Sequence, residues 1–514
     1  MKKKIFRLTN CLLAVVTMAS ILSGCDDNNT NTEDPTVTYP TSGDNTGLAT
    51  SEGILFNNGT QIGNGDSEFV FTGNKTISKG TYSLKGWVYV SSGATLTIEP
   101  GTIIKGDKLT KAALIVERGG KLIAQGNANN PIVFTSAQEA GSRKPGDWGG
   151  LIICGKAPNN QSNDMQIEGG PRTHHGGTDA TDNSGIISYV RVEFAGYPFA
   201  TDKEINGITL GSVGSGTQID HVQVSYSNDD SYEWFGGTVN CKYLIAFKGW
   251  DDEFDTDNGF SGHVQFGLSV RDPRIADASQ SNGFESDNCA DGNSTATPLT
   301  KAIFSNITFI GPATSINSSF ENTTTYITGG DIYPNNGSGL GKFQSAMQIR
   351  RSSNLNCFNS VAVGYPIGII IDGEKGNSVT SAKNGTIKVQ NTYFAGMTIL
   401  GSDANKHYVD ELGTYTDGTI TYDNTQESYS STFFKSQTGN RVYSSEDDLK
   451  LTGSTTTLGQ NYMPTSASPL LGVASFTDSS LSSFTTTTYI GAFSGTSDSW
   501  MTGWTNFDPE NTTY

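Results

Sequence analysis

HVQVSY (residues 221–226), KYLIAF (242–247) and HVQFGL (263–268) begin 21 residues apart and share one pattern of side chains. In each segment the second, fourth and sixth residues are apolar or aromatic, the period-2 pattern of a β-strand with one buried face. Aligned at that spacing, the segments give three apolar columns: Val222/Tyr243/Val264, Val224/Ile245/Phe266 and Tyr226/Phe247/Leu268. The opposite parity is largely polar and includes the column His221/Lys242/His263.

A fixed spacing that keeps buried and exposed side chains in register is typical of a solenoid. No helical pattern lies between the three segments, so the repeating unit is a strand and a turn. The spacing therefore predicts an all-β parallel β-helix whose neighbouring coils lie about 4.8 Å apart. In this fold Val222, Tyr243 and Val264 are expected to point inward together.

Short apolar segments separated by Gly or Pro turns continue on both sides of this stretch, at 87–90, 94–101, 131–136, 187–196, 305–311, 359–364 and 391–396. Insertions interrupt them, the longest near 158–185, 273–300 and 313–345. In solenoids such insertions form loops on one face, often the binding face.

Three further stretches carry a family resemblance: GATLTIEPGTIIKG (93–106), ALIVERGGKLIAQGNANNPIVFTS (113–136) and GDWGGLIICGKA (146–157). They resemble right-handed parallel β-helix surface proteins of the pectate-lyase-like superfamily. The resemblance implies a right-handed β-helix over residues 51–435. Residues 436–514 have a different composition, and we expect them to form a tail in which Trp500, Trp504 and Phe507 cap the last coil.

The N-terminus has the features of a targeting segment. Residues 1–24 combine a basic start with an apolar stretch, and Leu22-Ser23-Gly24-Cys25 resembles a bacterial lipobox. That resemblance implies a lipid anchor at Cys25, followed by a flexible linker over 25–50. Asp26-Asp27-Asn28-Asn29 resembles the export signal of Bacteroidota-type surface lipoproteins, which implies an outer-membrane protein facing the exterior. The alternative is an ordinary signal peptide with a chance cysteine.

The charge of the chain limits its expected binding partners, and the spacing of its cysteines limits their expected roles. The whole chain has 33 Lys and Arg against 51 Asp and Glu, a net charge of −18. Cleavage after residue 24 removes Lys2, Lys3, Lys4 and Arg7 and leaves a net charge of −22. We therefore expect no nucleic-acid partner and contact with a membrane only through the lipid anchor. The later cysteines lack metal-ligand spacing and are interpreted as small buried residues or as disulfide partners: Cys154, Cys241, Cys289 and Cys357.

Acidic residues concentrate between positions 229 and 287. The 21-residue spacing would align Asp230, Asp251 and Asp272 on successive coils, where their carboxylates would repel. Hard oxygen ligands from several turns suit Ca²⁺, so we predict a calcium site formed by Asp230, Asp251, Asp252, Asp255, Asp257 and Asp272. The alternative is a solvated acidic ridge without a metal.

The same residues support a second hypothesis. Asn228-Asp229-Asp230 and the segment 250–255 resemble the calcium-binding turns of family-nine polysaccharide lyases, in which a Lys abstracts a proton from the uronate. That resemblance implies Lys248 as the catalytic base, with Lys242 or Arg271 as alternatives. The family's Asp-Asp-Gly is Asp-Asp-Ser or Asp-Asp-Glu in this chain, which puts the lyase assignment in doubt.

Aromatic residues beside the acidic segment could stack on sugar rings, and Trp234 and Trp250 are the predicted ligand-binding residues. His174-His175 with Asp179 and Asp182 is a weaker candidate for a transition-metal site. Two functions follow from the sequence. The first is a non-catalytic surface protein that binds a glycan or an outer-membrane partner, stabilised by Ca²⁺. The second is a calcium-dependent lyase acting on uronate-containing glycans.

Overall fold

The computed structural model describes residues 55–56, 59–65, 68–168, 170, 172–200, 203–313, 319–326, 339–402, 413–417, 420–424, 427–454 and 462–514. The predicted signal peptide, Cys25 and the linker lie outside the described residues. Within the described part of the chain, neither α-helix has the length and apolar character needed to cross a bilayer.

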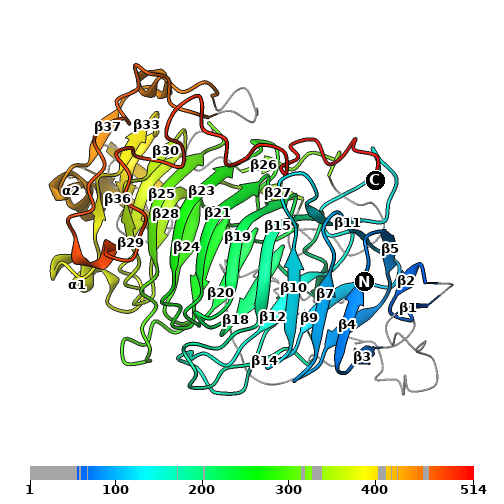
Figure 1. Ribbon diagram of the computed structural model, residues 1–514. Helices are drawn as coiled ribbons and strands as arrows, with labels where there is room; N and C mark the ends of the chain where they lie inside the picture. Colours follow the sequence, from blue (N-terminus) through cyan, green and yellow to red (C-terminus); the bar gives the residue numbers. More distant parts are fainter. Residues whose placement is uncertain are drawn as a thin grey trace, which may run out of the picture.

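The predicted parallel β-helix is confirmed (Figure 1). Sheet B, with 11 parallel strands, forms one face of the coils. Its strands are β3 (Phe69–Phe71), β6 (Trp87–Val90), β9 (Ala113–Val116), β12 (Gly150–Cys154), β18 (Ile208–Gly211), β20 (Tyr232–Phe235), β22 (Phe254–Asp257), β24 (Phe284–Ser286), β28 (Ser345–Ile349), β31 (Ile367–Ile371) and β34 (Ile399–Ser402).

Sheet A, with 18 strands, forms the remaining faces. Its strands are β1 (Leu55–Phe56), β2 (Gln61–Ile62), β4 (Asn74–Ile77), β5 (Thr81–Leu84), β7 (Thr95–Ile98), β8 (Ile103–Gly106), β10 (Lys121–Gln125), β11 (Ile132–Ser136), β15 (Gly185–Glu193), β19 (Gln218–Ser225), β21 (Asn240–Phe247), β23 (His263–Val270), β25 (Ile303–Ile310), β29 (Asn356–Phe358), β30 (Val361–Val363), β32 (Val389–Gln390), β33 (Tyr393–Ala395) and β37 (Arg441–Tyr443).

Short strand pairs, two helices and two 3-10 turns lie outside the two large sheets in the described part of the chain. They are the two-stranded pairs β13 (Met165–Gln166) with β14 (His174–His175), β16 (Pro198–Ala200) with β17 (Lys203–Glu204), β26 (Phe320–Glu321) with β27 (Leu340–Gly341) and β35 (Gly413–Asp417) with β36 (Ile420–Asn424), the helices α1 (Ser378–Lys383) and α2 (Tyr429–Ser436), and the 3-10 turns η2 (Glu446–Leu449) and η3 (Ser479–Leu481).

Sheet A bends along its length, which gives each coil three sides. The first half of β15 pairs with β10 and its second half with β11, and Tyr189 lies between the halves at φ 50°. His221, Tyr243 and Phe266 occupy the same place in the next coils with φ of 50°, 57° and 63°. A left-handed conformation costs a non-glycine residue about 1–2 kcal/mol. The four rings stack with centroids 4.3, 4.5 and 4.9 Å apart, which offsets part of that cost.

The predicted spacing of 21 residues is wrong. Val222 pairs with Leu244, a spacing of 22, and Leu244 pairs with Gly267, a spacing of 23. Val222 and Val264 do point into the main core, but Tyr243 lies in the half-buried column at the bend. A one-residue shift in register moves a side chain to the other face of a strand, so the predicted column Val222/Tyr243/Val264 does not exist.

The last coil is covered by a helix. Helix α2 packs on β31 and β34, and the ring of its Phe434 stacks on Phe394 of β33 at 4.2 Å between centroids. Phe433 and Phe434 are both buried. A covered end is required in a solenoid, because an open coil exposes unpaired strand edges.

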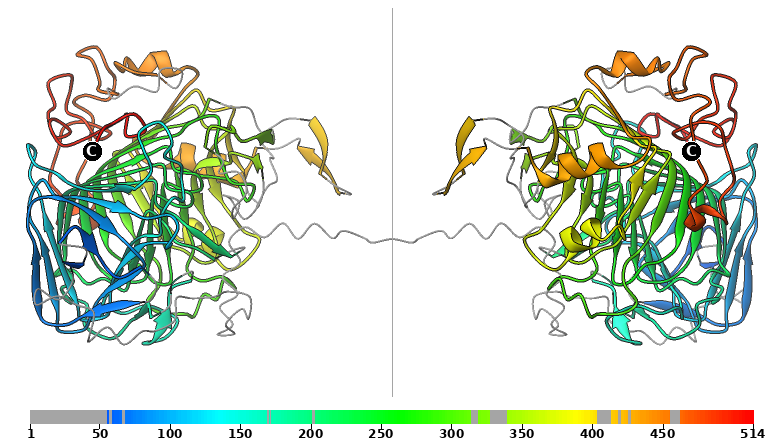
Figure 2. Two further views of the ribbon diagram at one scale, coloured as in Figure 1. Left: turned by 90° about the vertical axis from the view of Figure 1, so that its right-hand side faces the viewer. Right: turned by 90° about the vertical axis from the view of Figure 1, so that its left-hand side faces the viewer.

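The C-terminal tail is therefore not the predicted cap. It runs back along the bend and second half of sheet A, so that the C-terminus lies near β11 at the opposite end from α2 (Figures 1 and 2). Trp504 packs edge-on against Tyr189 and His221 at 5.9 Å, and Trp500 contacts Tyr243 at 5.5 Å. The tail buries the outer side of sheet A because Ile245, Leu268 and similar residues there are apolar.

Side-chain amides of sheet A hold the tail backbone. Gln223 donates to the carbonyl of Asn506 at 2.6 Å and accepts from its N–H at 2.9 Å. Gln265 makes the same pair of bonds with Thr485, at 2.7 and 2.9 Å. These reciprocal bonds satisfy buried polar groups on both partners and fix the path of the tail.

We predict that Trp504→Ala destabilises the protein by about 3–5 kcal/mol, because it removes a fully buried ring from the contact between the tail and sheet A. Hydrogen exchange should then accelerate in β15 and β19, which lie beneath the ring. Acceleration confined to β37 and α2 would instead support a cap on the last coil. Phe507→Ala, which removes a half-buried ring of the same tail, should cost less.

Candidate functional site

A row of polar side chains crosses the outer face of sheet B. The strand register aligns Thr209, Glu233, Asp255, Glu285 and Gln348 on β18, β20, β22, β24 and β28. Most of their strand neighbours of the other parity are apolar or aromatic and fill the core: Ile208, Tyr232, Trp234, Phe254, Phe284 and Met347. The period-2 alternation of these strands thus sends the carboxylates outward.

A second set of carboxylates lies in the turns that precede these strands. The N–H of Asp252 donates to Oδ1 of Asp230 at 2.7 Å, and the N–H of Asn282 donates to Oδ1 of Asp252. Asp229 and Asp251 precede them in the chain. We use the name carboxylate cluster for Asp229, Asp230, Glu233, Asp251, Asp252, Asp255 and Glu285.

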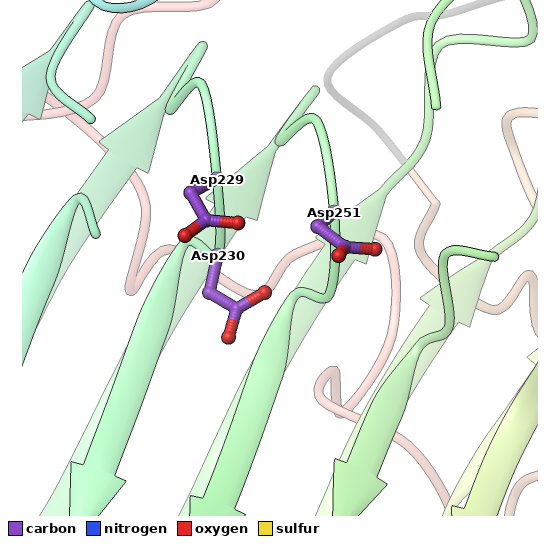
Figure 3. A group of neighbouring side chains, drawn as sticks. All are labelled: Asp229, Asp230 and Asp251. Carbon is purple, nitrogen blue, oxygen red and sulfur yellow. The ribbon is translucent and has the colours of Figure 1, made fainter. Parts of the chain in front are cut away.

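Two groups within the cluster have the spacing of cation ligands. One oxygen each from Asp229, Asp230 and Asp251 lie within 4.8 Å of one another. Figure 3 shows Asp229 and Asp230 on one turn and Asp251 on the turn of the next coil. One oxygen each from Asp230, Glu233 and Asp255 satisfy the same limit. Oxygens bound to one Ca²⁺ at about 2.3–2.6 Å lie at most about 4.6–5.2 Å apart, so each group can hold one ion.

Burial makes the negative charge of the cluster costly. The side chains of Asp230, Asp251, Asp252 and Asp255 belong to residues that are 5–7% exposed. Burial, together with the charges of Asp229 and Asp255, holds the pKa of Asp230 well above its usual value. Burial and the charge of Asp277 raise the pKa of Asp251 to about 7. Perturbation of this kind is frequent at functional sites.

Arginines pair with Glu285 of the cluster and with the neighbouring Glu253 and Asp287. Arg350 pairs with Glu285, and its Nε lies 2.8 Å from Asp287, which Arg351 also contacts at 3.0 Å. Burial still raises the pKa of Glu285 to about 7, against the charge of Arg350. On the other side, Arg271 lies 3.2 Å from Glu253 and donates to the carbonyl of Asp251.

Several buried polar atoms in and around the second group make no hydrogen bond. Asn206 donates its amide to Glu233, while its Oδ1 is buried without a hydrogen bond. Oγ1 of Thr209, Oδ1 of Asp255 and Nε2 of Gln348 are buried and unpartnered as well. Unsatisfied buried polar atoms are rare and call for a bound water, ion or ligand. The oxygens among these atoms, with the carboxylates, form a set that suits a hard cation such as Ca²⁺.

The predicted calcium site is only partly assembled. The structure brings together Asp230, Asp251, Asp252 and Asp255. Asp257 lies two residues after Asp255 in β22 and pairs with Phe235, so it is outside the row. Glu233 and Glu285 were not among the predicted ligands, although the echo of FDTDN (254–258) in FESDN (284–288) indicated a repeated acidic strand. Asn206, Thr209 and Gln348 carry no signal in the sequence that would have singled them out.

Asp272 does not belong to the cluster, so its inclusion in the calcium site is corrected. It pairs with Arg274 at 2.6 Å and with Lys248 at 3.6 Å. Burial acts to raise the pKa of Asp272, but the hydrogen bonds of Arg274 and the charge of Lys248 hold it below its usual value. The real spacing of 22 residues places Asp230 beside Asp252, which is why the column Asp230/Asp251/Asp272 fails.

Lys248, the predicted lyase base, belongs to this ion-pair network. Its ammonium donates to the hydroxyl of Tyr226 at 2.9 Å and lies over the rings of Tyr226 and Phe247. Burial lowers the pKa of Lys248, opposed by the charges of Asp272 and Glu510. Tyr226 follows β19 and Asp272 follows β23, both strands of sheet A, and Glu510 belongs to the tail. None of these three residues is a member of the carboxylate cluster.

The predicted sugar-binding aromatics are wrong. Trp234 and Trp250 are both fully buried. Trp234 points into the main core between Tyr232 and Phe260, and Trp250 packs with the apolar residues under the tail. Neither ring can stack on a glycan.

The structure also places the histidines of the weaker metal-site candidate and the four later cysteines. His175 is buried, its Nδ1 lies 2.8 Å from Oγ of Ser212, and burial lowers its pKa to about 3, so the ring is neutral. His174 instead faces Asp164 on the surface, and among the residues that the structure describes, the two acidic groups above are the sets with metal-ligand spacing. The four cysteines are small buried residues that form no disulfides, which was the first of the two interpretations: Cys154, Cys241, Cys289 and Cys357.

Comparisons with known proteins agree with the fold. The family model of pectate-lyase-like β-helix domains matches residues 70–505. Among solved structures, a crystal structure of the Dettilon tailspike protein is similar at 11% identity with a TM-score of 0.24. The match covers 66% of this chain and 61% of the tailspike chain. No curated protein matches the chain.

We predict that the cation-free protein loses stability as the pH rises from about 4 to about 7. Asp251 and Glu285 have pKa values of about 7 when folded, against about 4 when unfolded. In that window the folded state binds more protons than the unfolded state, so rising pH favours unfolding. Urea unfolding in chelator at several pH values measures this.

Two variants serve as controls for the pH dependence. Asp251→Asn and Glu285→Gln should each flatten it, because the substituted group no longer titrates. Asp272→Asn should leave it in place, since the pKa of Asp272 is lowered and that carboxylate contributes stability that is lost only towards acid pH. A cation-free protein that is equally stable at pH 5 and pH 8 would contradict the assignment.

Proposed function

Because the chain belongs to the family of pectate-lyase-like β-helix domains, we propose that it is a lipid-anchored cell-surface protein that binds acidic glycans through calcium held by its carboxylate cluster. The anchor is Cys25, and the resemblance of residues 26–29 to a surface-export signal supports an outer-membrane protein facing the exterior. The coils would then stand off the membrane on the linker 25–50.

The observation that carries the proposal is the environment of Asp230, Glu233 and Asp255. These three residues are buried carboxylates with oxygens within 4.8 Å of one another, and burial together with neighbouring carboxylates holds the pKa values of Asp230 and Asp255 well above the usual value. Asn206 and Thr209 present unpartnered oxygens beside the same group. Calcium takes six to eight oxygen ligands of this kind, and one ion would offset two of the three negative charges and give the neutral oxygens a partner.

An acidic glycan is the ligand class that fits the charge. A chain with a net charge of −22 after cleavage repels polyanions at long range. A calcium ion that keeps an open coordination position accepts a carboxylate or sulfate oxygen and removes that repulsion locally. The row along sheet B repeats at the strand spacing, which gives an extended face along which a polymer can lie.

Binding is favoured over cleavage by the position of Lys248. A lyase needs a base beside the calcium-bound uronate, and Lys248 is held by Asp272 and Tyr226 in the network near the tail. Among the described residues, Arg350 pairs with Glu285 of the cluster, while Arg271 and Arg351 pair with the neighbouring Glu253 and Asp287. All three are already paired with carboxylates.

We predict that millimolar Ca²⁺ raises the melting temperature of the mature protein and that chelator lowers it. An ion that binds only the folded state stabilises it by about 2.7 kcal/mol at a hundredfold excess over Kd. Asp255→Asn should reduce the shift strongly. Asp448→Asn, an exposed carboxylate outside the cluster, should keep it. Melting that is indifferent to both Ca²⁺ and chelator would contradict the calcium part of the proposal.

We predict that a glycan array probed with the mature protein shows binding to uronate-containing or sulfated glycans in Ca²⁺ and loss of binding in chelator. Asp255→Asn should lose the signal, and Trp234→Phe, a buried core change, should keep it. The ultraviolet absorbance of bound uronate polymers should stay constant during incubation. A rising absorbance from unsaturated uronate would favour the lyase.

A further inference from the structure

The hairpin of β13 and β14 lies on the outer side of sheet B. In β12, Leu151 and Ile153 point into the core, so Cys154 points outward. Cys154 shares a buried apolar cluster with Met165 of β13 and with Ile167, which follows that strand. Each of these three side chains is at most 7% exposed. The hairpin therefore buries part of the outward face of the sheet.

The side chain of His175 in β14 is fully buried in this contact. Its ring lies over Gly211 of β18, since a Cβ atom on that glycine would come within 2.7 Å of the imidazole. Cys154 and Phe235 are the residues that pair with Gly211 on the neighbouring strands β12 and β20. A side chain at position 211 would therefore push the hairpin away from sheet B.

The hydrogen bonds of His175 leave one ring nitrogen without a partner. Oγ of Ser212 accepts from the amide of Asn159 at 3.1 Å and lies 2.8 Å from Nδ1 of His175. Among the described residues, the buried Nε2 atom of the same ring has no hydrogen-bond partner. A buried polar atom of this kind loses the hydrogen bond that water would provide. Opening of the hairpin would restore that bond, so the closed position is held by a smaller margin than its apolar contact alone would give.

A protonated ring does not fit the closed position. Burial is the main reason that the pKa of His175 is lowered to about 3, and the positive charges of Arg118 and His174 act in the same direction, while Asp164 opposes them. Arg118 also holds the hairpin through an ion pair with Asp164 at 2.9 Å. The neighbouring thiol of Cys154 stays neutral because burial raises its pKa.

We infer that the hairpin of β13 and β14 is a pH-sensitive flap, which neutral His175 keeps closed over sheet B and which opens when that ring takes up a proton. In the open state the exposed ring has the ordinary pKa of about 6.5. Below that pH the open state binds more protons than the closed state, so the closed position loses stability as the pH falls from about 6.5 to about 3. This direction is opposite to that of the carboxylate cluster, and it concerns the hairpin alone. The inference is independent of calcium and glycan binding.

The accessibility of the Cys154 thiol in the full mature chain measures opening. A dithiodipyridine reagent reacts with thiols at acid and neutral pH, and mass spectrometry of the labelled peptides separates Cys154 from the other cysteines. Relative to an unfolded peptide of the same sequence, labelling of Cys154 should be about 30-fold faster at pH 5 than at pH 7.5, as the two pKa values require. The N–H of Gly176 donates to the carbonyl of Gly155 at 3.0 Å in the closed position. Its hydrogen exchange should accelerate in parallel, while sheet A keeps its protection.

Three variants separate the imidazole of His175 from other effects of acid. His175→Gln should make labelling of Cys154 equal at the two pH values, whether or not its hairpin stays closed, because the titrating group is gone. His174→Gln, a change at the exposed neighbouring histidine, should keep the dependence. Gly211→Ala should be labelled rapidly at both pH values, because its methyl group displaces the ring.

Three results would overturn the inference. The first is labelling of wild-type Cys154 at the same relative rate at pH 5 and pH 7.5. The second is a His175→Gln variant that keeps the acid-induced rise, which would assign the opening to another group. The third is loss of protection throughout sheet A at pH 5, which would show unfolding of the coils in place of a local opening of the hairpin.

Discussion

The stacking of carboxylates on successive coils is the constraint on which the outer face of sheet B depends. Strands of a sheet lie about 4.8 Å apart, so an acidic residue that is repeated in register lies beside another acidic residue on the next coil. Glu233, Asp255 and Glu285 do so. Arg350 compensates the Glu285 end of this row, while burial and the charges of Glu285 and Asp252 hold the pKa of Asp255 well above its usual value. The β-helix therefore concentrates negative charge wherever an acidic residue repeats in register.

The alternation of side chains was sufficient to predict the coils, because the parity of a strand depends only on residues two apart. The register was not predictable, because it depends on turns and on the bend of sheet A. A constant spacing of 21 would join Asp230 to Asp251 and Asp272. The observed spacing of 22 aligns Asp230 with Asp252, still brings Asp251 of the next turn close to Asp230, and leaves Asp272 with Arg274. One residue per coil thus decides which carboxylates meet.

The same bend explains the errors on the aromatic residues and the tail. Ile245 has the core parity of Cys241 at the start of its strand, but the left-handed Tyr243 at the bend reverses that parity, so Ile245 lies on the outer side. Tyr226 follows β19 and itself has φ 56°, so it too lies on the outer side although Val222 and Val224 point into the core. An apolar outer surface has to be covered, and Trp504 and the other apolar residues of the tail cover it. The cap on the last coil is supplied by α2, whose two adjacent phenylalanines gave no sign of that role in the sequence.

The opposite pKa directions of Asp272 and Asp230 separate structural carboxylates from those available to a ligand. Both are buried. Asp272 has Arg274 and Lys248, and its pKa is low, so its charge is already satisfied by the protein. Asp230 has other carboxylates as neighbours, and its pKa is high. Burial is common to both, so the difference comes from their partners. A buried carboxylate with carboxylate neighbours keeps its proton to a higher pH than one that is paired with cations, so the face of sheet B and the tail side respond to pH in opposite directions.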